Sequence, residues 1–152
     1  MGLLSPVGAR FDLNGVQSFY RNGRLGIQPA QGYKMENFAF VIEDDPDLST
    51  IFVKALEAAG FRVEAIRDGE VAQKRLQEAV PRVIVLDMHL PHVDGATLLK
   101  QIHENPAFSN TKIILATADN VRAEFYRDKA TIVLVKPISF SQLRDLSARL
   151  KL

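Results

Sequence analysis

The chain has 152 residues, a formal net charge of +1, 47% hydrophobic residues and no cysteine. Such a length and composition are typical of one globular domain with a substantial core. The absence of cysteine excludes disulfides, thiol catalysis and cysteine-bound zinc. The charge is too small to favour a nucleic-acid partner, and no apolar run reaches the roughly 18 residues that span a membrane. We therefore expect a cytoplasmic protein without a nucleic-acid or membrane partner.

The first 36 residues differ from the rest of the chain. Residues 1–34 hold six of the nine glycines, carry a net charge of +3 and show no clear helical or strand period. They also lack the cationic start and apolar stretch of a signal peptide. Because Met35 lies just before the first predicted strand, we interpret residues 1–36 as a flexible N-terminal extension or leader. A native adaptor arm is the alternative, and residues 37–152 are the predicted folded domain.

From residue 38 onward, short apolar stretches alternate with helical patterns. The predicted strands are Phe38–Ile42, Phe61–Ile66, Val83–Leu86, Lys112–Ala116 and Thr131–Val135. The predicted helices follow Asp45, cover Glu70–Ala79, follow Gly95 as far as Asn105, cover Val121–Asp128 and begin at Ser139. Parallel strands need crossover connections of about this length. The alternation therefore predicts an α/β fold with a five-stranded parallel sheet and helices on both faces.

Local signals mark the ends of some of these helices. Asp45 can cap a helix that takes Pro46 in its first turn and stops at Gly60. Ser139 begins a stretch with capping-box spacing ahead of an apolar stripe. The segment Val121–Asp128 has no clean apolar face, so it is the least regular helix that the sequence predicts.

Polar residues follow four of the predicted strands. Glu43 and Asp44 come after the first strand, Asp87 after the third, Thr117 after the fourth and Lys136 after the fifth. Taken singly, such residues are usually helix caps, turn residues or solvated charges. The carboxyl ends of parallel strands meet at one edge of the sheet, where open α/β sheets bind their ligands. Three carboxylates, a hydroxyl and an ammonium are thus predicted to share one site.

This combination favours phosphoryl chemistry. Clustered carboxylates repel one another unless a cation lies among them, and Mg²⁺ prefers a few carboxylates together with water and phosphate oxygens. We predict Asp87 as the nucleophile that forms an aspartyl-phosphate, because it stands alone at its strand end, with Glu43 and Asp44 as paired metal ligands. Lys136 and Thr117 would neutralise or hydrogen-bond the phosphoryl oxygens.

Four motifs give the sequence a resemblance to the receiver domain of two-component response regulators. They are Val41–Asp47, Val85–Gly95, Ala116–Ala118 and Val135–Pro137. The resemblance implies a flavodoxin-like doubly wound sheet with strand order 2-1-3-4-5. It also implies that a partner histidine kinase or phosphotransfer protein phosphorylates Asp87. The implied metal contacts come from Asp44, Asp87 and the backbone carbonyl of His89, with Glu43 acting largely through ordered water.

The sequence departs from the family pattern after Thr117. Val133 stands where family members usually carry an aromatic residue that moves with the threonine, and the chain between Thr117 and Lys136 is short. We therefore expect a truncated or irregular fourth helix and an altered choice of partner. His89 and Asp119 occupy positions at which family members tune the access of hydrolytic water to the phosphoryl group.

The leading hypothesis is a stand-alone, Mg²⁺-dependent phosphorylation switch or phosphorelay intermediate. It would assist its own phosphorylation without being a conventional enzyme, act on a downstream protein target and exist as a monomer or weak homodimer. A second hypothesis is a phosphorylation-independent scaffold, which Val133 supports best. A haloacid-dehalogenase-like phosphatase needs a second Asp two residues after the nucleophile, where this chain has His89. A transition-metal site of His89, His92 and Asp87 lacks a convincing fourth ligand.

Overall fold

The computed structural model describes residues 10–11, 16–21, 24–29 and 37–151. The chain divides into two compact units, Met1–Met35 and Glu36–Leu152. None of the helices in these described ranges has the length and hydrophobicity needed to cross a bilayer. Each unit is described by itself.

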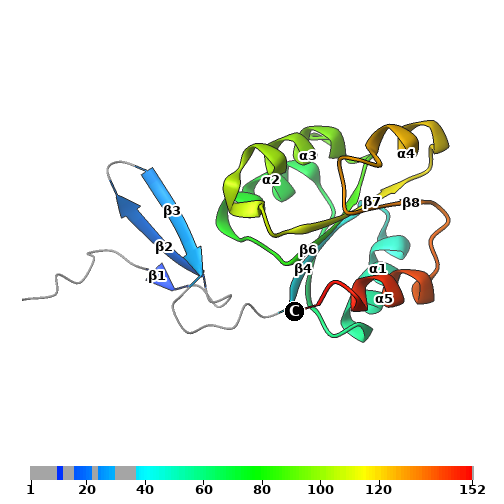
Figure 1. Ribbon diagram of the computed structural model, residues 1–152, viewed down its shortest axis with the longest axis horizontal. Helices are drawn as coiled ribbons and strands as arrows, with labels where there is room; N and C mark the ends of the chain where they lie inside the picture. Colours follow the sequence, from blue (N-terminus) through cyan, green and yellow to red (C-terminus); the bar gives the residue numbers. More distant parts are fainter. Residues whose placement is uncertain (1–9, 12–15, 22–23, 30–36, 152) are drawn as a thin grey trace, which may run out of the picture. The chain divides into compact units, whose positions relative to one another are not determined.

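The larger unit is built on a five-stranded parallel sheet (Figure 1). Its strands are β4 (Phe38–Ile42), β5 (Arg62–Ile66), β6 (Val83–Asp87), β7 (Lys112–Thr117) and β8 (Ile132–Val135). The spatial order is β5-β4-β6-β7-β8, and all four pairings are parallel. Numbered within this unit, the order is 2-1-3-4-5, so the predicted doubly wound flavodoxin-like fold is confirmed.

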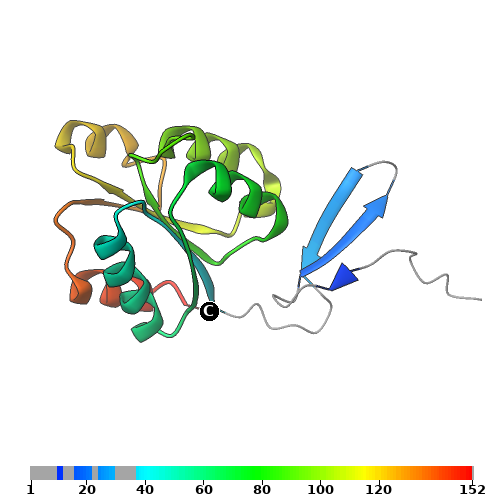
Figure 2. The same ribbon diagram turned by 180° about the vertical axis from the view of Figure 1, so that it is seen from behind.

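Helices cover both faces of the sheet. They are α1 (Pro46–Ala58), α2 (Gly69–Glu78), α3 (Gly95–Glu104), α4 (Asn120–Tyr126) and α5 (Phe140–Ala148), with a short 3₁₀ turn, η1, at Pro106–Phe108. Figures 1 and 2 show α1 and α5 together on one face and α2, α3 and α4 on the other. The predicted irregular fourth helix is the shortest of the five, with seven residues.

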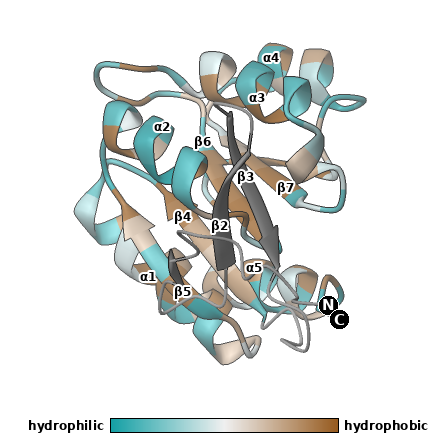
Figure 3. Ribbon diagram, turned by 90° about the vertical axis from the view of Figure 1, so that its left-hand side faces the viewer, coloured by the Kyte–Doolittle hydropathy of each residue, from teal (hydrophilic) through white to brown (hydrophobic). Residues whose placement is uncertain are grey.

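The hydrophobic core is split by the sheet into two clusters. One cluster includes Phe40, Leu86 and Leu98 and lies under α2 and α3. The other includes Val85, Phe52 and Leu143 and lies under α1 and α5. Every residue of β4 and β6 is buried, because successive side chains point to opposite faces and both faces are covered. Figure 3 shows these central strands in hydrophobic colours between helices whose outer surfaces are hydrophilic.

Side chains cap the helices at the edge of the sheet where the strands end. Asp45 accepts hydrogen bonds from the amides of Asp47 and Leu48, and Ser139 accepts one from the amide of Gln142, so both predicted caps are confirmed. Asp68, Asp94 and Asp119 cap α2, α3 and α4 in the same way. These caps fix where each helix leaves its strand, and therefore how the loops around the site are placed.

The smaller unit contains a three-stranded antiparallel sheet. The strands are β1 (Arg10–Phe11), β2 (Val16–Arg21) and β3 (Arg24–Pro29), in the order β1-β2-β3. They lie in a segment where the sequence shows no strand period. The sequence feature that could have indicated a hairpin is the pair Asn22-Gly23 between β2 and β3, because Asn-Gly is strongly associated with tight hairpin turns. Most of the segment interpreted as an extension or leader lies outside the described residues.

Candidate functional site

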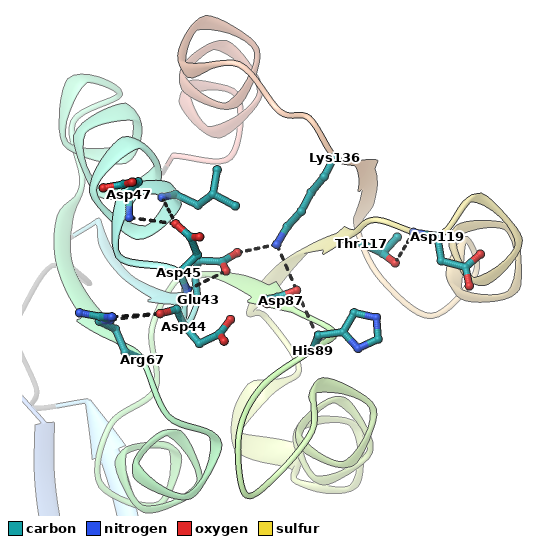
Figure 4. Close-up of polar contacts among 11 residues, drawn as sticks. Glu43, Asp44, Asp45, Asp47, Arg67, Asp87, His89, Thr117, Asp119 and Lys136 are labelled. Atoms are coloured by element: carbon teal, nitrogen blue, oxygen red, sulfur yellow. Dashed lines mark hydrogen bonds and ion pairs between the residues drawn. The ribbon is translucent and has the colours of Figure 1, made fainter.

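The polar residues predicted from the sequence do gather at the carboxyl edge of the sheet (Figure 4). Glu43 directly follows β4, Asp87 and Thr117 are the last residues of β6 and β7, and Lys136 directly follows β8. Because the strands are parallel and in register, their ends bring these residues together from positions up to 93 apart in the chain.

Lys136 binds two of the carboxylates at once. Its Nζ lies 2.9 Å from Oε2 of Glu43 and 3.3 Å from Oδ1 of Asp87. The backbone amide of Lys136 donates to the carbonyl of Thr117 at 2.8 Å, which fixes the start of the side chain against β7, and the Lys136–Pro137 peptide bond is cis. The Lys136 ammonium thus neutralises part of the negative charge of the Glu43 and Asp87 carboxylates.

Three carboxylates form a group that can hold a cation. One oxygen each from Glu43, Asp44 and Asp87 lies within 4.8 Å of the others, and this is the metal-capable group found among the described residues. Glu43 and Asp87 are 1% and 3% exposed, whereas Asp44 is exposed. The Asp44 backbone carbonyl accepts two hydrogen bonds from the Arg67 guanidinium, at 3.1 and 3.3 Å, which ties the loop after β4 to the loop after β5.

The two buried acids are not equivalent. Glu43 uses one oxygen on Lys136 and accepts the amide of Asp45 with the other, at 3.2 Å. Asp87 receives the amide of His89 on Oδ1 at 3.2 Å. Glu43 is therefore held by the protein through both oxygens, and it is also one of the three carboxylates that can hold a cation.

Burial dominates the ionisation of this group. Desolvation raises the pKa of Glu43 to about 7, against the opposing hydrogen bond from Lys136 and with the charge of Asp87 adding to the rise. Desolvation also raises the pKa of Asp87, although the His89 amide and the Lys136 charge oppose it. Burial by itself lowers the pKa of Lys136, but its contacts with Glu43 and Asp87 outweigh this and raise it. Without a cation, the site carries more negative charge than one lysine can balance.

Glycine is required where α3 leaves the loop that follows Asp87. A Cβ on Gly95 would lie 2.4 Å from the backbone carbonyl oxygen of Asp87, closer than any side chain tolerates. The amide of Gly95 donates to the carbonyl of Met88 at 3.2 Å. This close approach keeps the loop from Asp87 to Gly95 short and seated against the strand end.

Thr117 lies at the predicted strand end, but its hydroxyl is engaged elsewhere. The hydroxyl accepts the amide of Asp119 at 3.1 Å, and Figure 4 shows it on the side of the site toward α4. It is 1% exposed. In this conformation the Thr117 hydroxyl therefore braces the cap of α4, while Lys136 makes the direct contact with Asp87.

The histidines of the loop do not join the carboxylates. His92 contacts Asp68 through Nδ1, and neither His92 nor His89 is part of the metal-capable group of the described residues. This arrangement disfavours the transition-metal alternative. Sequence reasoning missed both the Asp68–His92 contact and the Arg67–Asp44 contact, because each joins residues more than 20 positions apart that carry no shared motif.

The family of the chain follows from comparison with known sequences. The model of the response regulator receiver domain matches residues 39–148. The chain therefore belongs to the response regulator receiver family, whose members serve as signalling switches in two-component systems.

Individual relatives agree with this assignment. The chain is 38% identical over 106 residues to the phosphate regulon transcriptional regulatory protein PhoB of Rhizobium meliloti (strain 1021), covering 68% of this chain and 47% of that protein. It is 30% identical over 122 residues to the probable methanogenesis regulatory protein FilR2 of Methanothrix harundinacea (strain 6Ac), covering 73% of this chain and 79% of that protein. The chain spans about half the length of PhoB.

A solved structure shows the same fold. The chemotaxis response regulator CheY4 of Vibrio cholerae superposes with a TM-score of 0.68 at 24% identity, covering 76% of this chain and 98% of that chain. The resemblance deduced from the four sequence motifs is therefore confirmed at the level of family and fold.

Proposed function

We propose that this protein is a phosphoacceptor receiver domain in which Asp87 takes a phosphoryl group from a partner histidine kinase or phosphotransfer protein. The observation that carries the proposal is the double contact of Lys136 with Glu43 and Asp87, beside three carboxylates that converge within 4.8 Å. A structural ion pair would need one acid for one lysine. Here the negative charge exceeds the positive charge, which suits a cation and a phosphoryl group.

The carboxylate group fits Mg²⁺, which receiver domains generally bind in an acidic pocket. Asp44, Asp87 and the backbone carbonyl of His89 would hold the ion, all of them oxygen ligands of the kind that Mg²⁺ prefers. Glu43 would act through ordered water, since its own oxygens are taken by Lys136 and the Asp45 amide. The bound ion would supply positive charge to the phosphoryl oxygens and help align the donor.

The transfer step is a substitution at phosphorus. A carboxylate oxygen of Asp87 forms the new O–P bond while the P–N bond of a donor phosphohistidine breaks. The leaving imidazole nitrogen keeps the electron pair of that bond and takes a proton from water. Lys136, held 3.3 Å from Asp87, stabilises the negative charge on the phosphoryl group during transfer. The protein thereby assists its own modification and works as a switch.

We propose that the readout begins at Thr117. Once Asp87 is phosphorylated, the Thr117 hydroxyl would exchange the Asp119 amide for a phosphoryl oxygen, which would loosen the cap of α4. Val133 on β8 is partly buried against the cluster under α2 and α3, in the place of the usual aromatic residue. A downstream protein target is proposed to recognise the changed α4 region.

The second candidate function is a phosphorylation-independent scaffold. Val133 favours it, because a small aliphatic side chain has no ring that could move between a buried and an exposed position. The two functions differ in a single outcome, which is whether modification of Asp87 changes the structure around α4.

The test is exposure of the protein to Mg²⁺ with acetyl phosphate or beryllofluoride. We expect acetyl phosphate to add one phosphoryl group by intact mass, and we expect either reagent to shift NMR signals around Asp87 and α4. Asp87→Asn should abolish both effects, while Asp145→Asn on the exposed face of α5 should leave them unchanged. Modification without any shift in α4 would favour the scaffold, and no modification at all would overturn the phosphoacceptor function.

The proposed partners are a histidine kinase or phosphotransfer protein and a protein target, with the domain as a monomer or weak homodimer. The expectation of no nucleic-acid partner and the cytoplasmic location stay predictions, as does the assignment of residues 1–36 as an extension. Profiling phosphotransfer from purified kinases would identify the donor.

A further inference from the structure

A side-chain contact fastens the loop after Asp87 to the start of a neighbouring helix. His92 lies in the loop between β6 and α3, and its Nδ1 contacts Oδ2 of Asp68. Asp68 is the N-cap of α2, and its other oxygen accepts the amides of Glu70 and Val71 at 2.8 and 3.1 Å. One carboxylate therefore holds the first turn of α2 and the loop at the same time.

The backbone of this loop also lies close to the backbone at the start of α2. The amide of Gly69 donates to the carbonyl of Pro91 at 3.1 Å, and a Cβ on Gly69 would lie 1.7 Å from the carbonyl oxygen of Val93. His92 has φ 68°, and within the described residues it is the non-glycine residue with positive φ. A histidine pays a conformational cost for this backbone that asparagine or glycine would largely avoid. The contact with Asp68 offsets that cost.

The same loop carries the groups proposed to handle phosphate and metal. It begins at Asp87, continues through His89, whose amide donates to Asp87 at 3.2 Å, and ends at Gly95. Backbone hydrogen bonds hold its two ends, and the His92–Asp68 contact holds its outer part. A change in that outer part would move the His89 carbonyl and amide relative to Asp87.

We propose that His92 and Asp68 form a latch that positions the Asp87 loop, so that breaking it weakens Mg²⁺ binding and slows phosphorylation. The inference rests on the proposed phosphoacceptor function. Both are positioning residues, since neither contacts the reacting atoms. The latch joins the imidazole Nδ1 of His92 to Oδ2 of Asp68, while Oδ1 of the same carboxylate caps α2.

Asp68 stays ionised at about pH 6, where the latch is tested. The amide of Val71 is the main cause that lowers its pKa, and the hydrogen bond with His92 adds to the effect. The other charged groups on the packed elements have described partners of their own: Arg67 on the Asp44 carbonyl, Glu70 on Lys74 at 3.5 Å, and Asp94 on the Thr97 amide. The side-chain contact described for Oδ2 of Asp68 is therefore the one with His92.

The first test compares phosphorylation by acetyl phosphate in wild type and His92→Asn. Asparagine tolerates positive φ but cannot carry the charge, so the backbone cost is separated from the latch. At about pH 6 we expect the variant to react about two- to fivefold more slowly, which is the range appropriate to an exposed pair of this kind. We also expect it to need more Mg²⁺ for half-saturation. His103→Asn, at the exposed end of α3, is the matched control and should behave as wild type.

A double-mutant cycle isolates the pair. Asp68→Asn keeps a capping residue on α2 while removing the charge. If the latch exists, Asp68→Asn and His92→Asn together should slow the reaction no more than either variant alone. Fully additive losses would overturn the proposal.

The second readout does not depend on phosphorylation. Hydrogen exchange of the Gly69 amide, which donates to Pro91, is measured in metal-free protein. We expect faster exchange in His92→Asn than in wild type at about pH 6 and equal exchange in His103→Asn. Unchanged exchange and unchanged rate in His92→Asn would overturn the latch. If wild type itself fails to react, the phosphoacceptor function falls, and faster Gly69 exchange would still support the latch as a structural contact.

Discussion

The region around Asp87 and the region around α4 are built in opposite ways. At the ends of β4 and β6 the acids Glu43 and Asp87 are 1% and 3% exposed and are held by Lys136 and by backbone amides. On α4, Val121 and Phe125 are 81% and 62% exposed, and the helix has seven residues. The comparison indicates that the buried carboxylate site tolerates little change, while the exposed surface of α4, where we propose the readout, is less constrained by packing.

Removing the lysine should produce the largest effect. Lys136→Met leaves Glu43 and Asp87 buried without their counter-ion, so we expect the free energy of unfolding in metal-free protein at about pH 8 to fall by about 2–4 kcal/mol. The loss should be smaller at about pH 5, where Glu43 holds a proton. Urea unfolding at both pH values measures the difference. Some phosphorylation should persist without the structural change in α4.

Lys74→Met is the control for that variant, since Lys74 forms an exposed pair with Glu70 at 3.5 Å. Its unfolding free energy should change by less than about 0.5 kcal/mol. Equal losses in the two variants, or a full spectral response to beryllofluoride in Lys136→Met, would contradict the role assigned to Lys136.

A methyl group at Gly95 should disturb the site almost as strongly. Gly95→Ala places a Cβ 2.4 Å from the Asp87 carbonyl oxygen, so the loop or the strand end must shift. We expect a loss of about 1–3 kcal/mol in unfolding free energy and weaker Mg²⁺ binding. Calorimetric titration with Mg²⁺ checks the second effect. Wild-type Mg²⁺ affinity in Gly95→Ala would show that the loop geometry is irrelevant to the site.

The metal-free protein should lose stability as pH rises. The pKa of Glu43 is raised from 4.5 to about 7 in the folded protein, so the folded state binds the proton more tightly than the unfolded state. Unfolding free energy should therefore be highest below about pH 4.5 as far as this group is concerned, and should fall between pH 4.5 and 7 by on the order of 1–3 kcal/mol. The raised pKa of Asp87 acts in the same direction.

Added Mg²⁺ should remove most of this decline, because the ion replaces the proton as the source of positive charge. Thermal unfolding with Mg²⁺ and with EDTA across this pH range is the measurement. If the unfolding free energy of the metal-free protein instead rises with pH over the same interval, the negative charge of the carboxylates does not exceed the positive charge in the site. The pKa values of Asp68 and Asp94 are lowered, so these two groups change the unfolding free energy only at lower pH, outside this interval.

A substitution on α4 should have the smallest effect on stability. Phe125 is exposed, stacks edge-on against Tyr126 with ring centroids 4.9 Å apart, and has the Lys129 ammonium 3.6 Å from its ring centroid. Phe125→Ala should cost about 0.5–1 kcal/mol at most and leave acetyl phosphate reactivity unchanged. Slower phosphorylation in Phe125→Ala would show that the two regions are more tightly coupled than their packing suggests.

The sequence by itself determined the strands and helices of the larger unit and the residues that meet at the carboxyl edge of its sheet, but not the strands β1, β2 and β3. Alternating apolar stretches predicted five strands, Asp45 and Ser139 predicted two helix caps, and polar residues after the strands identified Asp87 and Lys136. These signals are readable because strand period, caps and strand ends depend on residues close together in the chain.

Only the tertiary structure decided which of those side chains contact one another. Lys136 reaches across 93 positions to Glu43, the Thr117 hydroxyl accepts the Asp119 amide, and His92 contacts Asp68 across 24 positions. No local pattern encodes the first and third of these contacts, because they depend on the packing of helices against both faces of the sheet and on where each loop is anchored. The fold also separates the two neighbouring acids, because Glu43 is buried on Lys136 while Asp44 is exposed.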